Sequence, residues 1–273
     1  MVQGLSINTN TGAMVALEQL ALTQKRLQRT QLRITTGLKV NGPKDDAATF
    51  QIATRLRGDI AGTNAVKIAL ANGEAVVNVA ISGGKAIADL LIEMKAKVVQ
   101  ANQAGLDSAS RTALQNDFTA LRDQLDTIVA TAEFNSVNLI SSGATSTSVL
   151  STADGSSITV SAQAMASSSL GIAATSLATS AGASTALTAI DSAITLVADK
   201  LAALGAAAKR IEVQTDFTTS LVNILSEGLG NLVDADLAQE SATLQALQIQ
   251  QQLGVQSLAI ANAGPQTILG LFQ

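Results

Sequence analysis

The sequence has 273 residues, a formal net charge of −4, a pI near 4.8 and 47% hydrophobic residues. It contains no Cys, His, Trp or Tyr, which removes disulfides, thiolate nucleophiles, the commonest metal ligand and the usual acid–base residue of neutral pH. We therefore expect no catalytic, cofactor-binding or metal site, and no enzyme. The lack of a basic stripe with stacking aromatic residues also argues against nucleic-acid binding.

The first predicted helix covers residues 10–35. Asn8, Asn10 or Thr11 can cap its N-terminus, and leucines recur along it at helical spacing. The segment 35–43 contains two glycines and a proline, which ends the helix.

Two further helices are expected in the N-terminal half. The second helix runs from about residue 45 to about residue 100 and is weakened at Gly83-Gly84, by roughly 1 kcal/mol per glycine relative to alanine. The third helix runs to about Thr131 and begins at a cap formed by Ser108 or Ser110.

The composition changes sharply after the third helix. Between residues 141 and 185, 21 of 45 residues are Ser or Thr. Asp154-Gly155 suits a two-residue type I′ turn, and alternating apolar residues follow it at Ile158, Val160 and Ala162. We expect an exposed β-hairpin near 147–162; a disordered Ser/Thr-rich linker is the alternative.

Helical spacing returns in the C-terminal part. It begins near Ser184 and continues towards Gly228-Leu229-Gly230, which can interrupt the helix. The final helix is expected over about 232–263, and Gly264-Pro265 is typical of a helix end.

The final helix has two apolar stripes and no charged side chain from Ser241 onward. Interspersed glutamines leave no run of about 20 apolar residues, so no membrane insertion is expected. At 100° per residue, one stripe contains Val233, Leu237, Leu244, Leu247, Gln251, Val255 and Leu258, and the opposite stripe contains Ile249, Leu253 and Ile260. A helix with two apolar faces needs at least two neighbours. Our hypothesis is that this segment is mobile in the free chain and becomes helical when several copies pack together.

The two ends of the chain carry opposite charge. Residues 1–40 contain five bases and one acid, for a net of +4, whereas the chain from Ile211 onward contains six acids and no base. We expect the basic flank of the first helix to face the acidic start of the last. Surface ion pairs contribute about 0–1 kcal/mol each, so these charges set the register more than the stability.

Several stretches resemble bacterial flagellin, the self-assembling subunit of the flagellar filament. The stretches are SINTNTGAMVALEQL, ITTGLKVNGPKDDAATFQIATRLRGDI, EFNSVNL, LGAAAKRIEVQTDF and NLVDADLAQESATLQALQIQQQLGVQSLAIANAGPQTILGLF. The resemblance covers roughly residues 1–140 and 185–273. One departure is Leu232, which stands where the family usually has an Arg before the Asp-x-Asp-x-Ala run.

The resemblance implies a mainly α-helical, elongated, coiled-coil-like bundle formed by the N- and C-terminal segments, with the small β-hairpin as its β-element. Its inner, channel-lining domain pairs residues 1–36 with 236–273. Its middle domain combines 37–140 with 184–235, and residues 141–183 form an exposed Ser/Thr-rich segment where many flagellins insert larger outer domains.

The function that the resemblance implies is polymerisation into an extracellular filament for motility. Subunit addition is heterologous and does not close, which gives a helix rather than a ring. The expected partners are further copies and other flagellins, the flagellar type III export apparatus with an export chaperone, the filament cap and the hook-associated junction proteins. Residues 1–10 lack the basic and apolar regions of a cleaved signal peptide, so export without one is expected. The alternative is a hook–filament junction protein with similar terminal helices; a lipid-coating helical protein and a hydrolase fit less well.

Three groups of residues are predicted to serve this function. The expected assembly interface consists of Met14, Leu17, Leu20, Leu27, Leu32, Leu237, Leu244, Leu247, Ile249, Gln251, Leu253, Leu258 and Ile260. The expected interdomain elbow consists of Gly37, Gly42, Pro43, Gly228 and Gly230. Candidate O-glycosylation residues are Ser146, Ser148, Ser167, Ser168 and Thr175, against the alternative of an unmodified, solvent-exposed linker.

Two motifs resemble ligand sites only weakly. The segment GLKVNGPK over residues 37–44 differs from a phosphate-binding loop because Pro43 removes a donor and Asp45 replaces the Mg²⁺-binding hydroxyl. The pair Asp234-x-Asp236 lacks the Gly and Glu of a calcium loop. We interpret Asp45-Asp46 as charges at a helix start, where the helix dipole favours them, and the Asp234 pair as charges at a helix start or at an interface.

Overall fold

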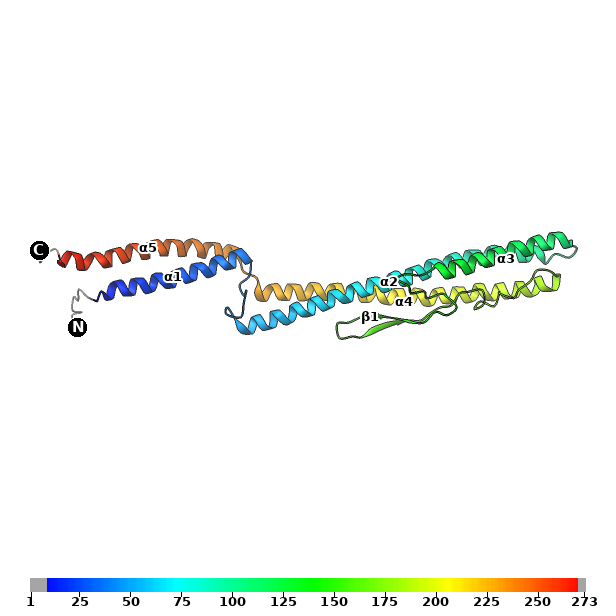
Figure 1. Cartoon of the computed structure of the whole chain (residues 1–273), viewed down its shortest axis with the longest axis horizontal. Coiled ribbons are helices and arrows are strands. Elements are labelled where there is room, and N and C mark those ends of the chain that lie inside the picture. Colours follow the sequence, from blue (N-terminus) through cyan, green and yellow to red (C-terminus); the bar gives the residue numbers. More distant parts are fainter. Residues whose placement is uncertain (1–8, 270–273) are drawn as a thin grey trace. The chain divides into compact units, whose positions relative to one another are not determined.

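The computed structural model describes residues 9–269, and beyond residue 263 it describes the backbone alone. The described part contains five helices and one two-stranded antiparallel sheet, so the mainly α-helical prediction with a small β-element is confirmed (Figure 1). In chain order the elements are α1 (Thr11–Thr36), α2 (Ala47–Ala101), α3 (Ser108–Thr131), β1 (Thr147–Leu150), β2 (Ser157–Val160), α4 (Ser180–Val233) and α5 (Leu237–Leu269).

The chain divides into two compact units. The terminal unit combines the residues up to Gly58 with those from Leu225 onward, and the central unit is Asp59–Ile224. The terminal unit contains α1 and α5; the central unit contains α3 and the β-hairpin, together with the greater part of α2 and of α4.

Helix α1 has a cap at each end. The Ala13 N–H donates to the Asn10 side-chain oxygen at 3.0 Å, so Asn10 is the N-cap among the candidates, and Asn8 lies outside the described residues. Gly37 ends the helix with a left-handed φ of 72°, a conformation that glycine adopts without strain, and its N–H donates to the Arg33 carbonyl at 2.8 Å. The predicted bounds of this helix are correct to within one residue.

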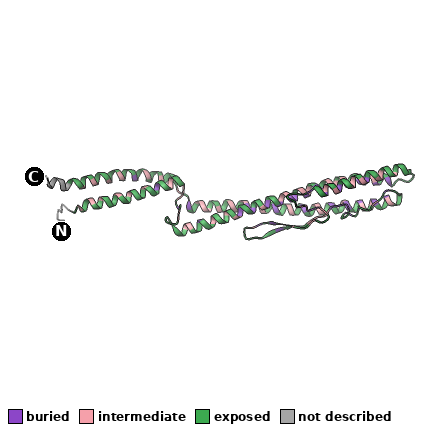
Figure 2. Ribbon diagram, in the orientation of Figure 1, coloured by how far each residue is buried: buried purple, intermediate pink, exposed green. Residues whose placement is uncertain are grey.

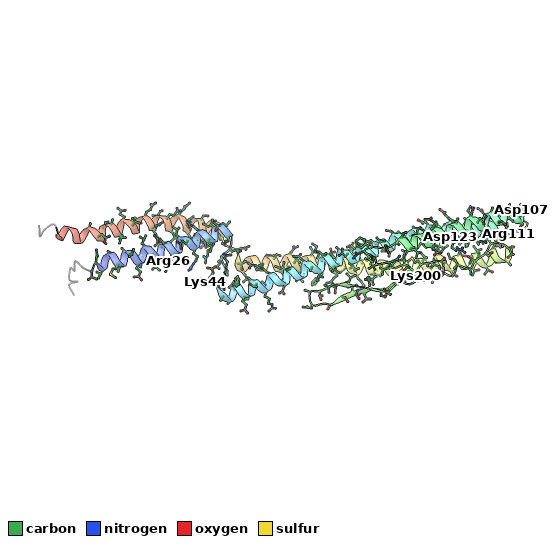
Figure 3. All side chains as sticks on the ribbon, in the orientation of Figure 1. Arg26, Lys44, Asp107, Arg111, Asp123 and Lys200 are labelled. Atoms are coloured by element: carbon green, nitrogen blue, oxygen red, sulfur yellow. The ribbon has the colours of Figure 1, made fainter. Side chains whose placement is uncertain are left out.

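Asp107, and not the predicted Ser108 or Ser110, caps α3. The Ser110 N–H donates to one oxygen of the Asp107 carboxylate at 2.7 Å. This hydrogen bond, with a second from the Ser110 hydroxyl, lowers the pKa of Asp107 from its ordinary value of 3.8. Arg111 in the same turn donates to the Ala101 carbonyl at the end of α2, so the two side chains together close the α2–α3 connection (Figure 3).

The central unit has a conventional apolar core. Its largest fully buried side chains come from α2, α3, α4 and the irregular segments that flank the hairpin: Leu70, Ile87, Leu91, Met94, Phe118, Leu125, Leu139, Ile140, Met165, Ile172, Leu177 and Ile190. By length and composition α2 is apolar enough to cross a membrane, and a third of its most apolar window is buried in the protein. The buried residues of this helix, such as Ile87, Leu91 and Met94, pack in the core of the central unit.

Two glycines of α2 permit close packing in this core. A Cβ on Gly84 would lie 2.7 Å from Leu201 Cδ2, and a Cβ on Gly83 would lie 3.0 Å from Ile140 Cδ1. The helix continues through both positions. The local weakness predicted for this pair is thus balanced by contacts that a larger residue would prevent.

The β-hairpin forms where it is predicted, with Thr147 paired to Val160 and Leu150 paired to Ser157. The predicted type I′ turn is wrong, because such a turn needs positive φ at both central residues and Asp154 has none. Instead, Gly155 has a φ of 95° and donates to the Thr152 carbonyl at 3.2 Å. The amides of Ser151 and Thr152 both donate to the Ser156 carbonyl, which is the pattern of a three-residue loop with a bulge.

The Ser/Thr-rich segment packs against the central core and is not a free linker. Val149 of β1 lies over Gly73 of α2, where an added Cβ would come within 2.5 Å of both Val149 methyl carbons. Gln214 of α4 donates to the Ser151 carbonyl at 2.9 Å. Further along, Ser167 is buried and donates from its amide and hydroxyl to the Asp126 carboxylate, at 2.9 and 2.6 Å. The Ser/Thr-rich segment therefore contains apolar side chains that pack on the core and hydroxyl or backbone groups that hydrogen-bond to it.

Candidate assembly interface

Helices α1 and α5 lie side by side over most of their length (Figure 1). The less exposed residues on each helix recur at alternating spacings of three and four. On α1 they are Ala13, Ala16, Leu20, Thr23, Leu27, Thr30 and Ile34, and on α5 they are Glu240, Leu244, Leu247, Gln251, Gly254, Leu258 and Ala261. This is the a/d pattern of a two-stranded coiled coil, and Thr30 and Leu247 are its most buried members, each 6% exposed.

The a and d positions of α1 and α5 form the seam between the two helices, and small and polar residues occupy many of these positions. A Cβ on Gly254 would lie 3.2 Å from Leu20 Cδ1, and one on Gly12 would lie 4.0 Å from the Ala261 Cβ. At this end of the pair the two helix backbones therefore come close together, and large side chains are not needed to fill the space between them. The seam contains only a few large aliphatic side chains, so pairing within one chain buries little apolar surface for helices of this length.

The outward faces of the pair carry exposed aliphatic residues. Ile249, Leu253 and Ile260 form one stripe on α5 and are 58%, 59% and 68% exposed. On α1, Met14 is 62% exposed and Leu17 is 57% exposed. Figure 2 shows that exposed residues follow the outward faces of both helices. Contiguous apolar surface of this kind marks interaction sites in soluble proteins.

The predicted assembly residues thus fall into two sets. Six of them turn towards the partner helix within the chain: Leu20, Leu27, Leu244, Leu247, Gln251 and Leu258. Seven of them are exposed: Met14, Leu17, Leu32, Leu237, Ile249, Leu253 and Ile260.

The seam of the pair is narrower than the stripe predicted from a helical wheel. Val255 aligns with Leu244 when 100° is counted per residue, but it is 55% exposed. It lies beside the a and d positions, because a coiled coil follows a period of 3.5 residues and not 3.6. Gln251 lies in the seam, whereas its neighbours Gln248 and Gln252 are exposed.

The predicted charge pairing of the two helices is present. Arg33 of α1 forms an ion pair with Glu240 of α5 at 2.9 Å, with the two side chains 28% and 14% exposed. A groove of about 790 Å³ lies beside this pair and is lined by bases of α1 and by acids such as Asp236. Arg26, one of these bases, is labelled in Figure 3. Because the ion pair is partly shielded from water, it fixes how the two helices align along their length more strongly than an exposed pair would.

The segments that follow α1 and precede α5 are held together by backbone hydrogen bonds. The amides of Lys39 and Val40 both donate to the Val233 carbonyl, at 2.7 and 3.3 Å. In the other direction, the Ala235 amide donates to the Gly37 carbonyl at 2.9 Å. A small apolar cluster of Val40, Ala53 and Val233 supports these bonds.

Of the predicted elbow residues, Gly37, Gly42 and Pro43 lie in the connector between α1 and α2. The amides of Asn41 and Gly42 donate to the Asp45 carboxylate, and Asp46 caps α2 by accepting from the Ala48 and Thr49 amides. The Thr49 hydroxyl also donates to Asp46, and these bonds lower its pKa. The loop amides that a phosphate would need are thus occupied by the protein's own carboxylate.

Gly228 and Gly230 lie inside α4, so the predicted helix interruption there is wrong. The break comes after Val233, and α5 starts five residues later than predicted. Asp236 determines the new start, because its carboxylate accepts from the Ala238 and Gln239 amides at 2.9 and 3.1 Å. The signal for this boundary is present in the sequence as Asp followed by helix formers, which is an N-cap pattern.

Two other predicted helix ends also differ. Helix α4 begins at Ser180, where the Thr179 hydroxyl oxygen accepts from the Gly182 amide at 3.0 Å, and not near Ser184. Helix α5 continues through Gly264-Pro265 to Leu269, so the predicted stop is also wrong.

The five candidate glycosylation residues have different surroundings. Ser146, Ser148 and Ser168 are exposed. Thr175 is half-buried and donates to the Ile172 carbonyl at 2.7 Å, and Ser167 is buried on Asp126. Within residues 9–269, no group of three or more His, Cys, Asp or Glu side chains comes together as a metal site would require.

Comparison with known proteins identifies the family of the chain. Residues 7–145 match the family model of the bacterial flagellin N-terminal helical region, and residues 187–272 match that of the C-terminal helical region. The chain is 42% identical to flagellin FljM of Caulobacter vibrioides over 98% of each chain, and 34% identical to flagellin C of Rhizobium meliloti over 98% of this chain and 99% of the relative. The crystal structure of Bacillus cereus flagellin has a similar fold, with a TM-score of 0.50 and 21% identity, over 54% of this chain and 86% of that one.

Proposed function

The chain belongs to the bacterial flagellin family and is a structural subunit of the flagellar filament, and from this premise we propose that the outward faces of α1 and α5 bind further copies of the chain. The observation that carries the proposal is the α5 stripe of Ile249, Leu253 and Ile260. Its three side chains are exposed although the opposite side of the same helix is paired with α1.

Burial of this stripe is favourable and has little electrostatic cost. Fully burying one large aliphatic side chain contributes about 1.5–3 kcal/mol. The segment from Ser241 onward has no charged side chain, so neighbouring copies can cover it without desolvating an ion. The contact joins different surfaces of successive copies, and it therefore continues as a helix and does not close.

In the single chain α5 is already helical, so we now propose only that it becomes more rigid on assembly, and not that it first becomes helical there. Seven of the fourteen residues of the inward seam are Ala, Thr, Gly or Gln, and seven of the thirteen predicted interface residues are exposed. Copies that cover the outward stripe add apolar contacts to a helix pair that has few of its own. The pair is then most rigid in the polymer and exchanges its amide hydrogens faster in the free chain.

The exposed faces of α1 and α5 also suggest partners before and during assembly. An unpolymerised chain carries apolar surface that an export chaperone would cover, and the flagellar export apparatus, the filament cap and the junction proteins would meet the same helices. We propose on this basis that the chain reaches the extracellular filament by flagellar export.

For the Ser/Thr-rich segment, residues 141–183, we propose O-glycosylation at Ser146, Ser148 and Ser168. Each of these side chains is exposed and lies in or beside the Ser/Thr-rich segment that packs on the central core. Ser167 and Thr175 are no longer part of the proposal, because their hydroxyls donate to Asp126 and to the Ile172 carbonyl. Mass spectrometry of native filaments tests it, and an intact mass equal to that of the bare polypeptide would contradict it.

The assembly proposal is tested by adding one charge at two adjacent exposed positions of α5. Leu253→Asp places a carboxylate in the outward stripe, and we expect the critical concentration for polymerisation to rise at least about tenfold, which corresponds to about 1.4 kcal/mol. Gln252→Asp adds the same charge at an exposed position beside the stripe and should polymerise as the wild type does.

The measurement is pelleting of polymer over a range of concentrations, with negative-stain images of the pellets. Circular dichroism of both soluble variants checks that the helices are intact. Filaments of normal length from Leu253→Asp at the wild-type concentration would contradict the proposed interface, as would equal losses in the two variants.

A further inference from the structure

The start of α1 is joined to α5 through one amide side chain. The Asn10 side-chain nitrogen donates to the Ala261 carbonyl at 2.7 Å, across 251 positions of sequence. We propose that Asn10 is a positioning residue that fastens α1 to α5 by supplying the hydrogen bond that Pro265 takes away from Ala261.

The need for this bond follows from the sequence of α5. In an α-helix each carbonyl accepts from the amide four residues further on. For Ala261 that residue is Pro265, which has no N–H, yet α5 continues through it to Leu269. A backbone carbonyl that loses its partner needs another donor, either from the protein or from water. Asn10 provides that donor.

Asn10 performs two tasks at once, and the two tasks fix its orientation. Its side-chain oxygen accepts from the Ala13 amide at 3.0 Å and so caps α1, while its nitrogen faces the Ala261 carbonyl. One partner is a donor and the other is an acceptor, so only one orientation of the amide satisfies both. Asp, Ser and Thr cap a helix about as well as Asn does, but none of them offers both a cap acceptor and an N–H donor of this reach.

The small residues around this contact make it possible. The position of Gly12 lies against Ala261, where an added Cβ would come within 4.0 Å of the Ala261 Cβ. Ala13 and Ala16 form the adjoining seam on α1. The helices are therefore close enough here for a short side chain to bridge them.

The bridge complements the ion pair at the other end of the helix pair. Arg33–Glu240 holds the end of α1 to the start of α5, and Asn10–Ala261 holds the start of α1 towards the end of α5. With both contacts made, the two helices have one alignment along their length. In the proposed assembly, that alignment determines how the outward stripes of α1 and α5 are placed side by side.

The test is a double-mutant cycle on the full chain. Asn10→Asp keeps the cap acceptor and loses the donor, and Pro265→Ala restores the N–H that Ala261 would ordinarily receive. We expect Asn10→Asp to raise the exchange rate of amides in peptides covering residues 255–263 by about 2- to 10-fold, the range that one net hydrogen bond supports. In the Pro265→Ala background the same substitution should have much less effect.

Hydrogen exchange with mass spectrometry is the readout, in filaments and in the free chain, so the result does not depend on polymer formation. Protection of the first turn of α1 should survive in Asn10→Asp, because Asp still caps the helix; this separates the bridge from the cap. Asn10→Ser, which also keeps only the cap, should behave like Asn10→Asp. Equal effects of Asn10→Asp with and without Pro265 in both states would overturn the proposal, and so would unchanged exchange over residues 255–263.

Discussion

The central unit and the α1–α5 pair solve the problem of burying apolar residues in different ways. In the central unit, side chains such as Phe118, Leu91 and Met94 are completely buried by other parts of the same chain. In the pair, the largest aliphatic residues of the outward stripe are more than half exposed, and the seam contains glycine, alanine and threonine. One region completes its core within one chain, and the other leaves a large part of its apolar surface exposed, which in our proposal is covered by other copies.

This difference shows where a polymer subunit places its stability. The central unit can fold before assembly, because its core needs no partner. The pair is held in one chain by a narrow seam, by Arg33–Glu240 and by the Asn10 bridge, and each of these is a modest contribution. Surface that remains apolar in the free chain is then available to drive addition of the next copy.

The sharpest test of this comparison is a cavity in the central core. Phe118→Ala should lower the free energy of unfolding by about 3–5 kcal/mol, because the ring is 0% exposed and its space cannot be refilled. Urea denaturation followed by circular dichroism measures the change. Phe217→Ala is the matched control, since that ring is 59% exposed on α4, and it should cost less than about 0.5 kcal/mol. Equal losses would remove the distinction between a closed core and an open surface.

Within the pair, neighbouring residues on opposite faces of α5 should behave differently. Leu247→Ala, in the seam, should speed amide exchange over residues 240–255 in the free chain, since truncating a fully enclosed leucine to alanine costs about 2–5 kcal/mol. Ile249→Ala is 58% exposed before substitution, so it should leave that exchange unchanged and raise only the critical concentration for polymerisation. Neither variant should change the unfolding of the central unit. A reversed pattern would mean that the two faces have been assigned the wrong way round.

The hairpin belongs to the central unit only if its docking on α2 is specific. Gly73→Ala adds a methyl group within 2.5 Å of the Val149 methyl carbons, and we expect a loss of about 1–3 kcal/mol in the free energy of unfolding. Val149→Ala in the same chain should recover part of that loss. Gly205→Ala in α4 has no atom within 4 Å of the new methyl group and should stabilise the helix by about 0.5–1 kcal/mol. Thermal unfolding separates the three variants.

The smallest expected effect concerns the helix caps and pH. Hydrogen bonds from Ser110 lower the pKa of Asp107, so the folded chain keeps this carboxylate charged to lower pH than the unfolded chain does. Its contribution is full above about pH 4 and is lost as the pH falls through the lowered pKa. Asp107→Asn keeps the cap without the charge. The difference in melting temperature between wild type and variant should therefore shrink from pH 5 to pH 2.5, both values being approximate. A difference that grows on acidification would contradict this assignment.

Features set by neighbouring residues could be predicted from the sequence. The bounds of α1 followed from leucine spacing and the glycine at residue 37, and the hairpin followed from apolar alternation around Asp154-Gly155. The pairing of α1 with α5 was anticipated from their opposite charges and is realised in Arg33–Glu240. Residue spacing and turn residues act locally, and net charge is a sum over a segment, so all three can be read without knowing the tertiary structure.

Some errors came where a long-range contact overrides a local preference, and others where a nearby residue caps the helix in place of the expected one. Gly264-Pro265 predicts a stop, but α5 continues there because Asn10, from the other end of the chain, replaces the lost donor. Gly83-Gly84 looks like a weak point until the contacts at Leu201 and Ile140 are known. Gly228-Leu229-Gly230 remains helical, and the break occurs at the cap that Asp236 provides.

By itself, the sequence determined that this chain is helical, belongs with the flagellins and has apolar residues on two sides of its last helix. Only the tertiary structure decided which of those sides packs against α1 within the chain, because burial of a helix face depends on where a second helix lies and not on the periodicity of the residues. It also decided which serine hydroxyls are free and which backbone carbonyl needs a donor from a distant residue. Composition and period describe one helix at a time, whereas burial and hydrogen bonding are properties of pairs.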